Sequence, residues 1–313
     1  MPEWLIERGI GETRAVLVED GRIVEARIIY DDIVPAGTIL DARLKSVGRN
    51  AIAVADGEEY LLPKGAPGVT QGAPLRIEVT REGLGGVESW KRPLARATDE
   101  APGAVQPLDG REVACPGFDD ELEAAGWSDL LEEARTGWIA FPGGELRISL
   151  TPAMTLIDVD GQLAPDELAV AGARAAAQAI RRHAIGGSIG IDLPTPKGKQ
   201  ARQAAAAAID ELLPQPFERT AVNGFGFIQI VRPRRHASLF ELASDRAPFE
   251  ARALLRQAAR EVGAVRLAAH PAVIAELNRN PGWLDRLSRQ TGGLVTLRDD
   301  PSLAMSGGHA ERC

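Results

Sequence analysis

The sequence predicts a mixed architecture of α/β and all-β parts, in which a β-hairpin and a small β-barrel precede an α/β segment and a small α+β module. Two observations support this prediction. Short apolar runs broken by glycine- and proline-containing turns fill the first 92 residues, and strands alternate with long helices from residue 154 onward. At 313 residues, the chain is long enough for two or three small domains.

The N-terminal hairpin is expected over residues 4–29, because two alternating runs flank the two-residue turn Asp20-Gly21. Residues 34–92 are expected to form a small closed barrel of the oligonucleotide-binding (OB) type. Its short strands are predicted at 37–47, 50–55, 58–62 and 73–82. A barrel that binds no ligand would give the same pattern, so both interpretations stay open.

Residues 93–117 are rich in proline, glycine and alanine and are expected to form a linker. The following segment, 118–153, contains a helix predicted over 119–135 and a strand predicted over 145–151. We expect this segment to complete the N-terminal part of the protein.

The clearest pattern lies in segment 154–243, where apolar strands and long helices alternate. Strands are predicted at 154–160, 188–193 and 225–231, and helices at 166–183 and 199–213. Such a β-α-β-α-β run predicts an α/β sheet with right-handed crossovers. Residues 244–313 are expected to form a separate module of alternating helices and strands that ends in a frayed tail.

Composition narrows the classes of function. The two cysteines, Cys115 and Cys313, are too few for a disulfide framework or a CxxC zinc site, so no zinc site is expected. No apolar run approaches the roughly 18 to 20 residues of a membrane helix, and no secretion signal is visible, so we expect a cytoplasmic protein without a membrane partner. The net charge of −8 conceals a basic segment, 174–202, of net charge +5, where a polyanion would have to bind.

Asp158 and Asp192 form the sharpest candidate site, because each ends an apolar strand and one helix joins the two strands. If these strands are parallel neighbours, both carboxylates emerge at the sheet edge where α/β folds place ligands. Asp160, two residues beyond Asp158, points the same way. Oxygen ligands that leave positions open for water and phosphate suit Mg²⁺, although strand-terminal aspartates also cap turns and helices without any metal.

Basic residues around this segment suit phosphate contacts, although a solvated helix face would carry similar charges. They are Lys197, Lys199, Arg202, Arg232 and Arg234. In the barrel, Tyr60 either stacks on bases or belongs to the core. The basic residues expected to bind RNA there are Lys45, Arg49, Arg76, Arg81, Lys91 and Arg92. His183, at a helix end, is expected to be a cation that stabilises the helix dipole.

The order of these segments resembles the ribonuclease E/G family of endoribonucleases. The resemblance is carried by LIERGIGETRAVLVEDGRIVE, MTLIDVDG, GGSIGIDLPTP, FGFIQIVRPR, AAHPAVIAEL and LVTLRDD. It implies an RNase H-like hairpin at 1–33 that is completed by 118–153, a DNase I-like catalytic segment at 154–243 and a KH-like module at 244–313.

The resemblance also implies site residues. Asp158 and Asp192 correspond to the family aspartates that hold the catalytic Mg²⁺, for which Mn²⁺ is an alternative, and Asp160 stands where the family has an asparagine. Phe225 belongs to a Phe-Gly segment expected to contact RNA. The family's 5′-monophosphate sensor and its zinc-binding CPxCxG motif are both missing from this sequence, so a homo-oligomer would not be linked by zinc.

We therefore expect a Mg²⁺-dependent endoribonuclease that cuts single-stranded RNA, with catalytic residues Asp158, Asp192 and Asp160. DNA is not expected as a substrate, and a protein partner is left open. Two alternatives stay open: a non-catalytic RNA-binding protein derived from the same family, and an unrelated α/β phosphohydrolase that acts on nucleotides. Metal-dependent internal cleavage of RNA distinguishes the first hypothesis from both.

Overall fold

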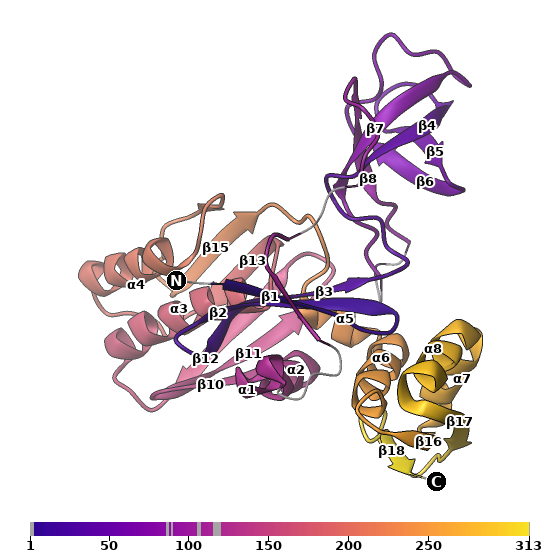
Figure 1. Ribbon diagram of the computed structural model, residues 1–313. Helices are drawn as coiled ribbons and strands as arrows, with labels where there is room; N and C mark the ends of the chain where they lie inside the picture. The colour runs from indigo at the N-terminus through magenta and orange to yellow at the C-terminus, as the bar shows by residue number, and fades with distance from the viewer. Residues whose placement is uncertain (1–2, 86–87, 89, 105–107, 115–119, 313) are drawn as a thin grey trace.

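The computed structural model describes residues 3–85, 88, 90–104, 108–114 and 120–312. Its strands form a four-stranded, a six-stranded and a three-stranded sheet and a closed five-stranded barrel (Figure 1). The predicted mixture of α/β and all-β parts is confirmed, including a barrel consistent with the OB type. None of the helices in these residues combines the length and the apolar character needed to cross a lipid bilayer.

The N-terminal hairpin belongs to a four-stranded sheet of order β3-β2-β1-β9. Its strands are β1 (Glu3–Arg8), β2 (Glu12–Glu19), β3 (Arg22–Tyr30) and β9 (Arg111–Val113). The turn between β2 and β3 has positive φ at both Asp20 and Gly21, as a type I′ turn requires. β9 pairs in parallel with β1, so Leu5 faces Arg111 although the whole barrel lies between them in sequence.

The barrel strands close in the order β4-β5-β6-β8-β7. They are β4 (Ile39–Ser46), β5 (Ala51–Ala55), β6 (Glu58–Leu62), β7 (Pro74–Arg81) and β8 (Leu94–Thr98). The predicted boundary at residue 92 is therefore too early, and the predicted linker 93–117 contains two strands, β8 and β9. The apolar pattern of β8 is too weak to reveal it, because Ala95 is its only fully buried residue.

Two short helices, α1 (Glu121–Ala124) and α2 (Trp127–Thr136), replace the single helix predicted over 119–135. They are separated because Gly126 adopts a φ of +101°, a left-handed conformation that interrupts a helix. Trp127 and the buried leucines of both helices pack against the first sheet and against α5 (Leu239–Ser244). The N-terminal hairpin is thus covered by helices that follow it much later in the chain.

The α/β segment is built on a six-stranded sheet of order β10-β11-β12-β13-β15-β14. Its strands are β10 (Trp138–Phe141), β11 (Gly144–Leu150), β12 (Thr155–Gly161), β13 (Gly187–Asp192), β14 (Glu218–Arg219) and β15 (Phe227–Arg232). Helices α3 (Pro165–Arg182) and α4 (Lys199–Leu212) pack against one face of this sheet (Figure 1). We call the opposite face the open face.

The strand pairing of this sheet differs from the prediction in two respects. β12 and β13 are parallel as expected, but β15 is antiparallel to β13, because α4 leads first into β14, which pairs with β15. β10 and β11 form a hairpin whose second strand pairs with β12. The segment 138–150 therefore extends the α/β sheet instead of completing the N-terminal sheet.

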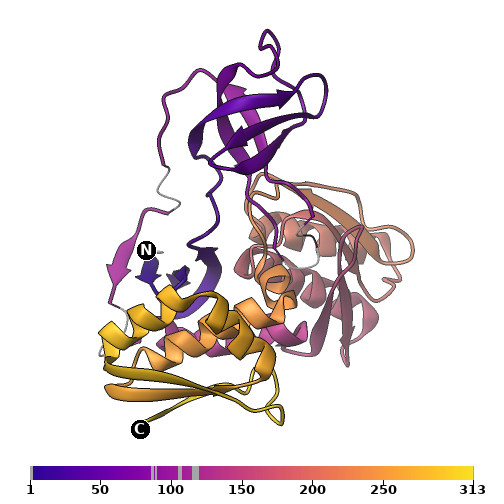
Figure 2. The same ribbon diagram turned by 90° about the vertical axis from the view of Figure 1, so that its right-hand side faces the viewer.

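The C-terminal module combines three helices with a three-stranded sheet of order β17-β16-β18. Its elements are α6 (Arg246–Ala258), β16 (Gly263–Ala269), α7 (Pro271–Arg279), α8 (Pro281–Thr291), β17 (Gly292–Asp299) and β18 (His309–Arg312). β18 pairs with β16, so the predicted frayed tail contains a strand. The module and the barrel lie at opposite ends of the molecule (Figures 1 and 2).

Buried charges join the N-terminal sheet to the C-terminal module. Glu12 on β2 and Arg256 on α6 form an ion pair in which both side chains are more than nine-tenths buried. One turn earlier on α6, the guanidinium of Arg252 lies 3.7 Å from the ring centroid of Tyr30 and 4.6 Å from that of Trp283. These contacts hold α6 against the end of the N-terminal hairpin.

Candidate functional site

Asp158 and Asp192 are direct neighbours on the parallel strands β12 and β13, since the register pairs the two residues. The prediction that their strands are parallel neighbours is confirmed. Alternation along the strands buries Ile157, Val159 and Ile191 in the core beneath the helices. The two aspartates therefore lie exposed on the open face.

A row of side chains crosses the open face through this pair. Strand register links Trp138 to Arg147, Arg147 to Asp158, and Asp192 to Phe227. Directly paired residues on neighbouring strands point to the same face, so the row places an aromatic ring at each end and the carboxylates between them. Trp138 is 48% exposed, unusually open for a tryptophan in a strand.

The acidic groups of the open face disfavour one another's charge. Partial burial raises the pKa of Asp158 above its ordinary value, and the negative charges of Asp160 and Asp192 raise it further. Arg147 opposes this shift, but its guanidinium is bound to Glu145 at 2.8 Å. Two neighbouring carboxylates are stabilised in their charged form by a cation held between them.

Asp160 lies on the same face but pairs with Glu145 of β11, two residues further along β12 than Asp158. Within the described parts of the chain, no group of three or more histidine, cysteine, aspartate or glutamate residues is placed to hold a metal ion. The structure thus brings together Asp158 and Asp192 as a pair, with Asp160 beside it. Two carboxylates fit Mg²⁺, which commonly takes one or two from the protein and fills its other positions with water and phosphate.

The segment after β13 and the loop before β15 bring further candidates to this edge. Phe225 is 83% exposed, and its carbonyl accepts a hydrogen bond from the Thr195 hydroxyl at 3.2 Å. Lys197 is exposed, and its backbone N–H donates to Asp166 at the start of α3. Lys199 is exposed at the first position of α4. One aromatic ring and two lysines therefore lie at the end of the sheet that carries the aspartate pair.

Gly190, two residues before Asp192, is required by packing on the open face. A Cβ at this position would lie 2.6 Å from the ring of Phe227 and 3.0 Å from Leu156 and Met154. The Phe227 ring therefore lies across Gly190. It forms an apolar floor next to the carboxylates, and the glycine of the GGSIGID segment makes room for it.

Arg232 and Arg234 do not flank the aspartates, contrary to the prediction. Because β15 is antiparallel to β13, Arg232 pairs with Gly187, at the opposite end of β13 from Asp192. Five residues of extended strand separate the two positions by roughly 16 Å. These arginines belong to a different part of the surface.

In the barrel, Tyr60 is 1% exposed and is part of the core, so the prediction that it stacks on bases is wrong. Its alternation within β6 turns it inward together with Leu62. Arg49 is exposed in the turn between β4 and β5. Arg76 lies 3.6 Å from Asp41.

The other barrel cations that were predicted to bind RNA already contact groups of the protein. Lys45 and Arg92 share the carboxylate of Glu59, which lowers the pKa of that group. Arg81 donates to the backbone carbonyl of Arg92 at 2.7 Å. Lys91 pairs with Glu88 and lies over the ring of Trp90. An RNA strand on this barrel would have to compete with these contacts.

His183 is fully buried at the end of α3, where burial lowers its pKa despite a hydrogen bond to Glu133 at 2.9 Å. The expectation that it is a cation serving the helix dipole is therefore wrong. The neutral ring packs against Phe240, with 4.6 Å between the ring centroids. This histidine has a structural role.

Trp138, Arg147 and Phe227 are the residues of the row across the open face that sequence reasoning missed. A signal for Arg147 exists, since it alternates with the buried Leu146 and Ile148 in β11. The alternation shows that Arg147 faces away from the core. It does not reveal that β11 pairs with β12, which brings Arg147 beside Asp158.

Comparison with known proteins adds no family to this description. None of the family models searched and none of the curated proteins matches the chain. The functional reading of the site therefore depends on the geometry of its own residues.

Proposed function

We propose that this chain is a Mg²⁺-dependent endoribonuclease that cleaves single-stranded RNA on the open face, in the manner of the ribonuclease E/G family. The observation that carries the proposal is the direct pairing of Asp158 and Asp192 at the carboxyl ends of parallel strands. Carboxylates repel the phosphates of RNA unless a cation lies between them. A protein that only binds RNA would gain nothing from this pair.

The same proposal assigns the parts of the fold. The N-terminal sheet is RNase H-like, the barrel is an OB fold that contacts RNA, the six-stranded sheet is a DNase I-like catalytic segment and the last module is KH-like. The closed barrel and the parallel β12–β13 pair support this assignment. The finer domain names depend on the resemblance of the sequence segments.

The residues of the open face have different roles in the proposed reaction. Asp158 and Asp192 would hold Mg²⁺ or Mn²⁺ through carboxylate oxygens, and the bound ion would supply an activated water and positive charge at the scissile phosphate. Lys197 and Lys199 contact the neighbouring phosphates. Asp160 orients water beside the pair. Hydrolysis in this arrangement leaves a 3′-hydroxyl and a 5′-phosphate.

The exposed aromatic rings favour a single-stranded substrate. Neighbouring strands are about 4.8 Å apart, so Trp138 lies roughly 10 Å from Asp158 across the sheet. On the other side, Phe227 pairs with Asp192, and the exposed Phe225 lies in the loop just before it. Single strands offer unstacked bases to such rings, whereas duplexes do not. A strand that crosses the open face would meet one ring on each side of the carboxylates.

The test of the proposal is the cleavage of a fluorescent single-stranded RNA with Mg²⁺ and with EDTA, by the wild type and by Asp192→Asn. We expect internal cuts that carry 5′-phosphates, require Mg²⁺ and disappear in the variant. RNA binding without cleavage by either protein would leave the non-catalytic alternative. Hydrolysis of nucleotides alone would indicate a phosphohydrolase.

Trp138→Ala is expected to weaken the binding of a single-stranded RNA about tenfold, because one stacked base contributes roughly 1 to 3 kcal/mol. The affinity should be measured by fluorescence anisotropy with Ca²⁺ in place of Mg²⁺. Trp138→Phe is the matched control, since it keeps a ring but loses the hydrogen bond from Nε1 to Glu145. Equal affinity of wild type and Trp138→Ala would show that RNA does not cross this ring.

A further inference from the structure

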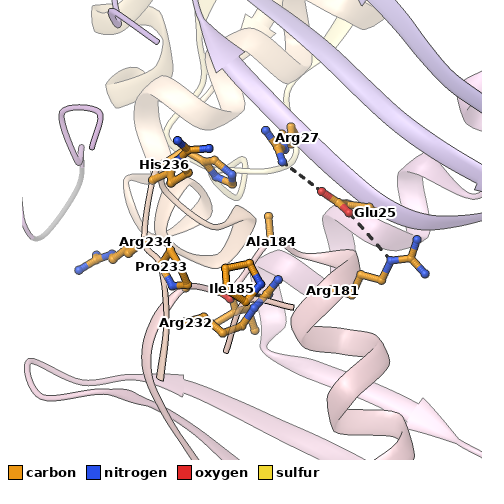
Figure 3. Close-up of a pocket in the computed structure, with 12 residues that line it drawn as sticks. Glu25, Arg27, Arg181, Ala184, Ile185, Arg232, Pro233, Arg234 and His236 are labelled. Atoms are coloured by element: carbon orange, nitrogen blue, oxygen red, sulfur yellow. Dashed lines mark hydrogen bonds and ion pairs between the residues drawn. The ribbon is translucent and has the colours of Figure 1, made fainter. Parts of the chain in front are cut away.

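A second candidate site lies at the opposite end of β13 from the aspartates. A cavity of about 540 Å³ opens where β3, the end of α3 and the segment after β15 meet (Figure 3). Its charged lining consists of five arginines, one histidine and a single glutamate, Glu25. We call this cavity the arginine pocket.

Carboxylates pair with three of the five arginines and leave two without an ion pair. Arg27 and Arg181 share Glu25, at 3.2 and 3.9 Å (Figure 3), and Arg181 also lies 3.3 Å from Glu19. Arg234 pairs with Glu88 and Glu241. Arg232 and Arg235 form no ion pair with any residue that the structure describes. Arg232 is instead half-buried and donates to the carbonyl of Ile185 at 3.1 Å. The five arginines thus outnumber the four carboxylates that pair with them by one, and the uncompensated positive charge lies at Arg232 and Arg235.

Unpaired hydrogen-bond donors give a second, independent observation. The Nε atoms of Arg27, Arg181, Arg232 and Arg234 are buried, and none has an acceptor among the described residues. Buried donors in native proteins nearly always have a partner. Four such donors belong to arginines around one cavity, and because the Nε atoms themselves are covered, the guanidinium groups have to turn before a ligand with acceptor oxygens reaches them.

The pKa of His236 is affected by burial and by the same positive charges. Burial lowers its pKa to about 4, and the charges of Arg27, Arg232 and Arg235 contribute to this shift. The imidazole ring lines the pocket together with these arginines. An anion in the pocket would offset the part of this shift that the arginine charges contribute.

We propose that the arginine pocket binds a phosphate group. Planar guanidinium groups donate in pairs to phosphate oxygens, which makes arginine the preferred side chain for this recognition. The volume is that of a site for a small phosphorylated molecule. The phosphate belongs either to such a free molecule or to an RNA strand, and the site is separate from the aspartate pair, so the inference does not depend on the proposed nuclease.

The experiment is calorimetric titration of the whole protein with pyrophosphate, adenosine 5′-monophosphate or an oligoribonucleotide lacking terminal phosphates. EDTA is present, so that no phosphate is held through a cation at Asp158 and Asp192. Arg232→Gln and Arg235→Gln should each weaken phosphate binding at least tenfold. Arg232→Lys keeps the positive charge and should weaken binding less than Arg232→Gln does. Arg235 is exposed, and its link to the neighbouring segment is a backbone hydrogen bond from Glu82 to its carbonyl, which a change of side chain preserves, so its replacement leaves folding intact.

Arg174→Gln is the matched control, because it removes an arginine from the outer side of α3, where Arg174 pairs with Glu211. This variant should bind as the wild type does. Binding of the two small ligands identifies a free phosphorylated molecule, and binding of the oligonucleotide alone identifies the RNA backbone. Absence of binding by all three near 1 mM, or unchanged binding by both pocket variants, would overturn the proposal.

Discussion

Asp158→Asn is expected to lower the rate of Mg²⁺-dependent RNA cleavage about a thousand-fold while leaving the free protein at least as stable as the wild type. The loss corresponds to roughly 4 kcal/mol of transition-state stabilisation, which is the scale of a metal ion at a reacting phosphate. Asparagine keeps the shape of the side chain but removes its negative charge. It also relieves the repulsion from Asp160 and Asp192.

The free energy of unfolding of Asp158→Asn should also depend less on pH than that of the wild type, because the variant has no carboxyl group to titrate at this position. Because the pKa of Asp158 is raised in the folded protein, first by partial burial and then by the neighbouring aspartates, the folded state binds more protons than the unfolded state between the ordinary and the raised pKa. The protonated Asp158 therefore stabilises the folded protein fully at pH values below the ordinary pKa of aspartate. This stabilisation is lost as the pH rises through the raised pKa of Asp158 in the folded protein. The exposed position keeps this effect below about 1 kcal/mol.

Thermal unfolding with and without Mg²⁺ measures the metal site without relying on catalysis. Mg²⁺ should raise the melting temperature of the wild type, because it binds only the folded pair, and should not raise that of Asp158→Asn. Asp285→Asn, on the exposed side of α8, is the control and should respond as the wild type does. Cleavage by Asp158→Asn at the wild-type rate would contradict the metal site.

Glu12→Ala is expected to destabilise the protein by about 3 to 5 kcal/mol, the largest effect on stability expected of any single change considered. The change leaves the guanidinium of Arg256 buried without its carboxylate. The free energy of unfolding in urea measures the loss. Glu211→Ala breaks an exposed pair with Arg174 and should change stability by less than about 1 kcal/mol.

A double variant separates the cost of an unpaired charge from the worth of the pair. Glu12→Leu combined with Arg256→Met fills similar volume with apolar atoms and should recover most of the stability lost by the single change. If Glu12→Ala proves nearly neutral, the ion pair is not the contact that holds α6 to the N-terminal sheet.

Local patterns in the sequence predicted the elements with strong periodicity. The strands and helices between 154 and 213 were placed within one or two residues, because long apolar helices alternate there with short apolar strands. β8 and β9 were missed for a physical reason. β9 has only three residues, none of them fully buried, and is held by pairing with β1 rather than by an apolar pattern of its own.

The same distinction applies to the site. The neighbourhood of Asp158 and Asp192 was predictable, because a single helix crossover determines that their strands run parallel and side by side. The direction of β15 depends on how the chain returns after α4, which the residues of β15 do not encode. Arg232 was therefore assigned to the wrong end of the sheet.

The pairing of β1 with β9 has a consequence for the order in which the protein is made. Strand β1 cannot pair with β9 until residues 111–113 have left the ribosome, whereas all barrel strands lie between residues 39 and 98. At about 5 to 20 residues per second, the free edge of β1 stays open for roughly 5 to 20 seconds. The barrel is thus the first unit able to close during synthesis, and the nascent hairpin must avoid other chains until its late partner arrives.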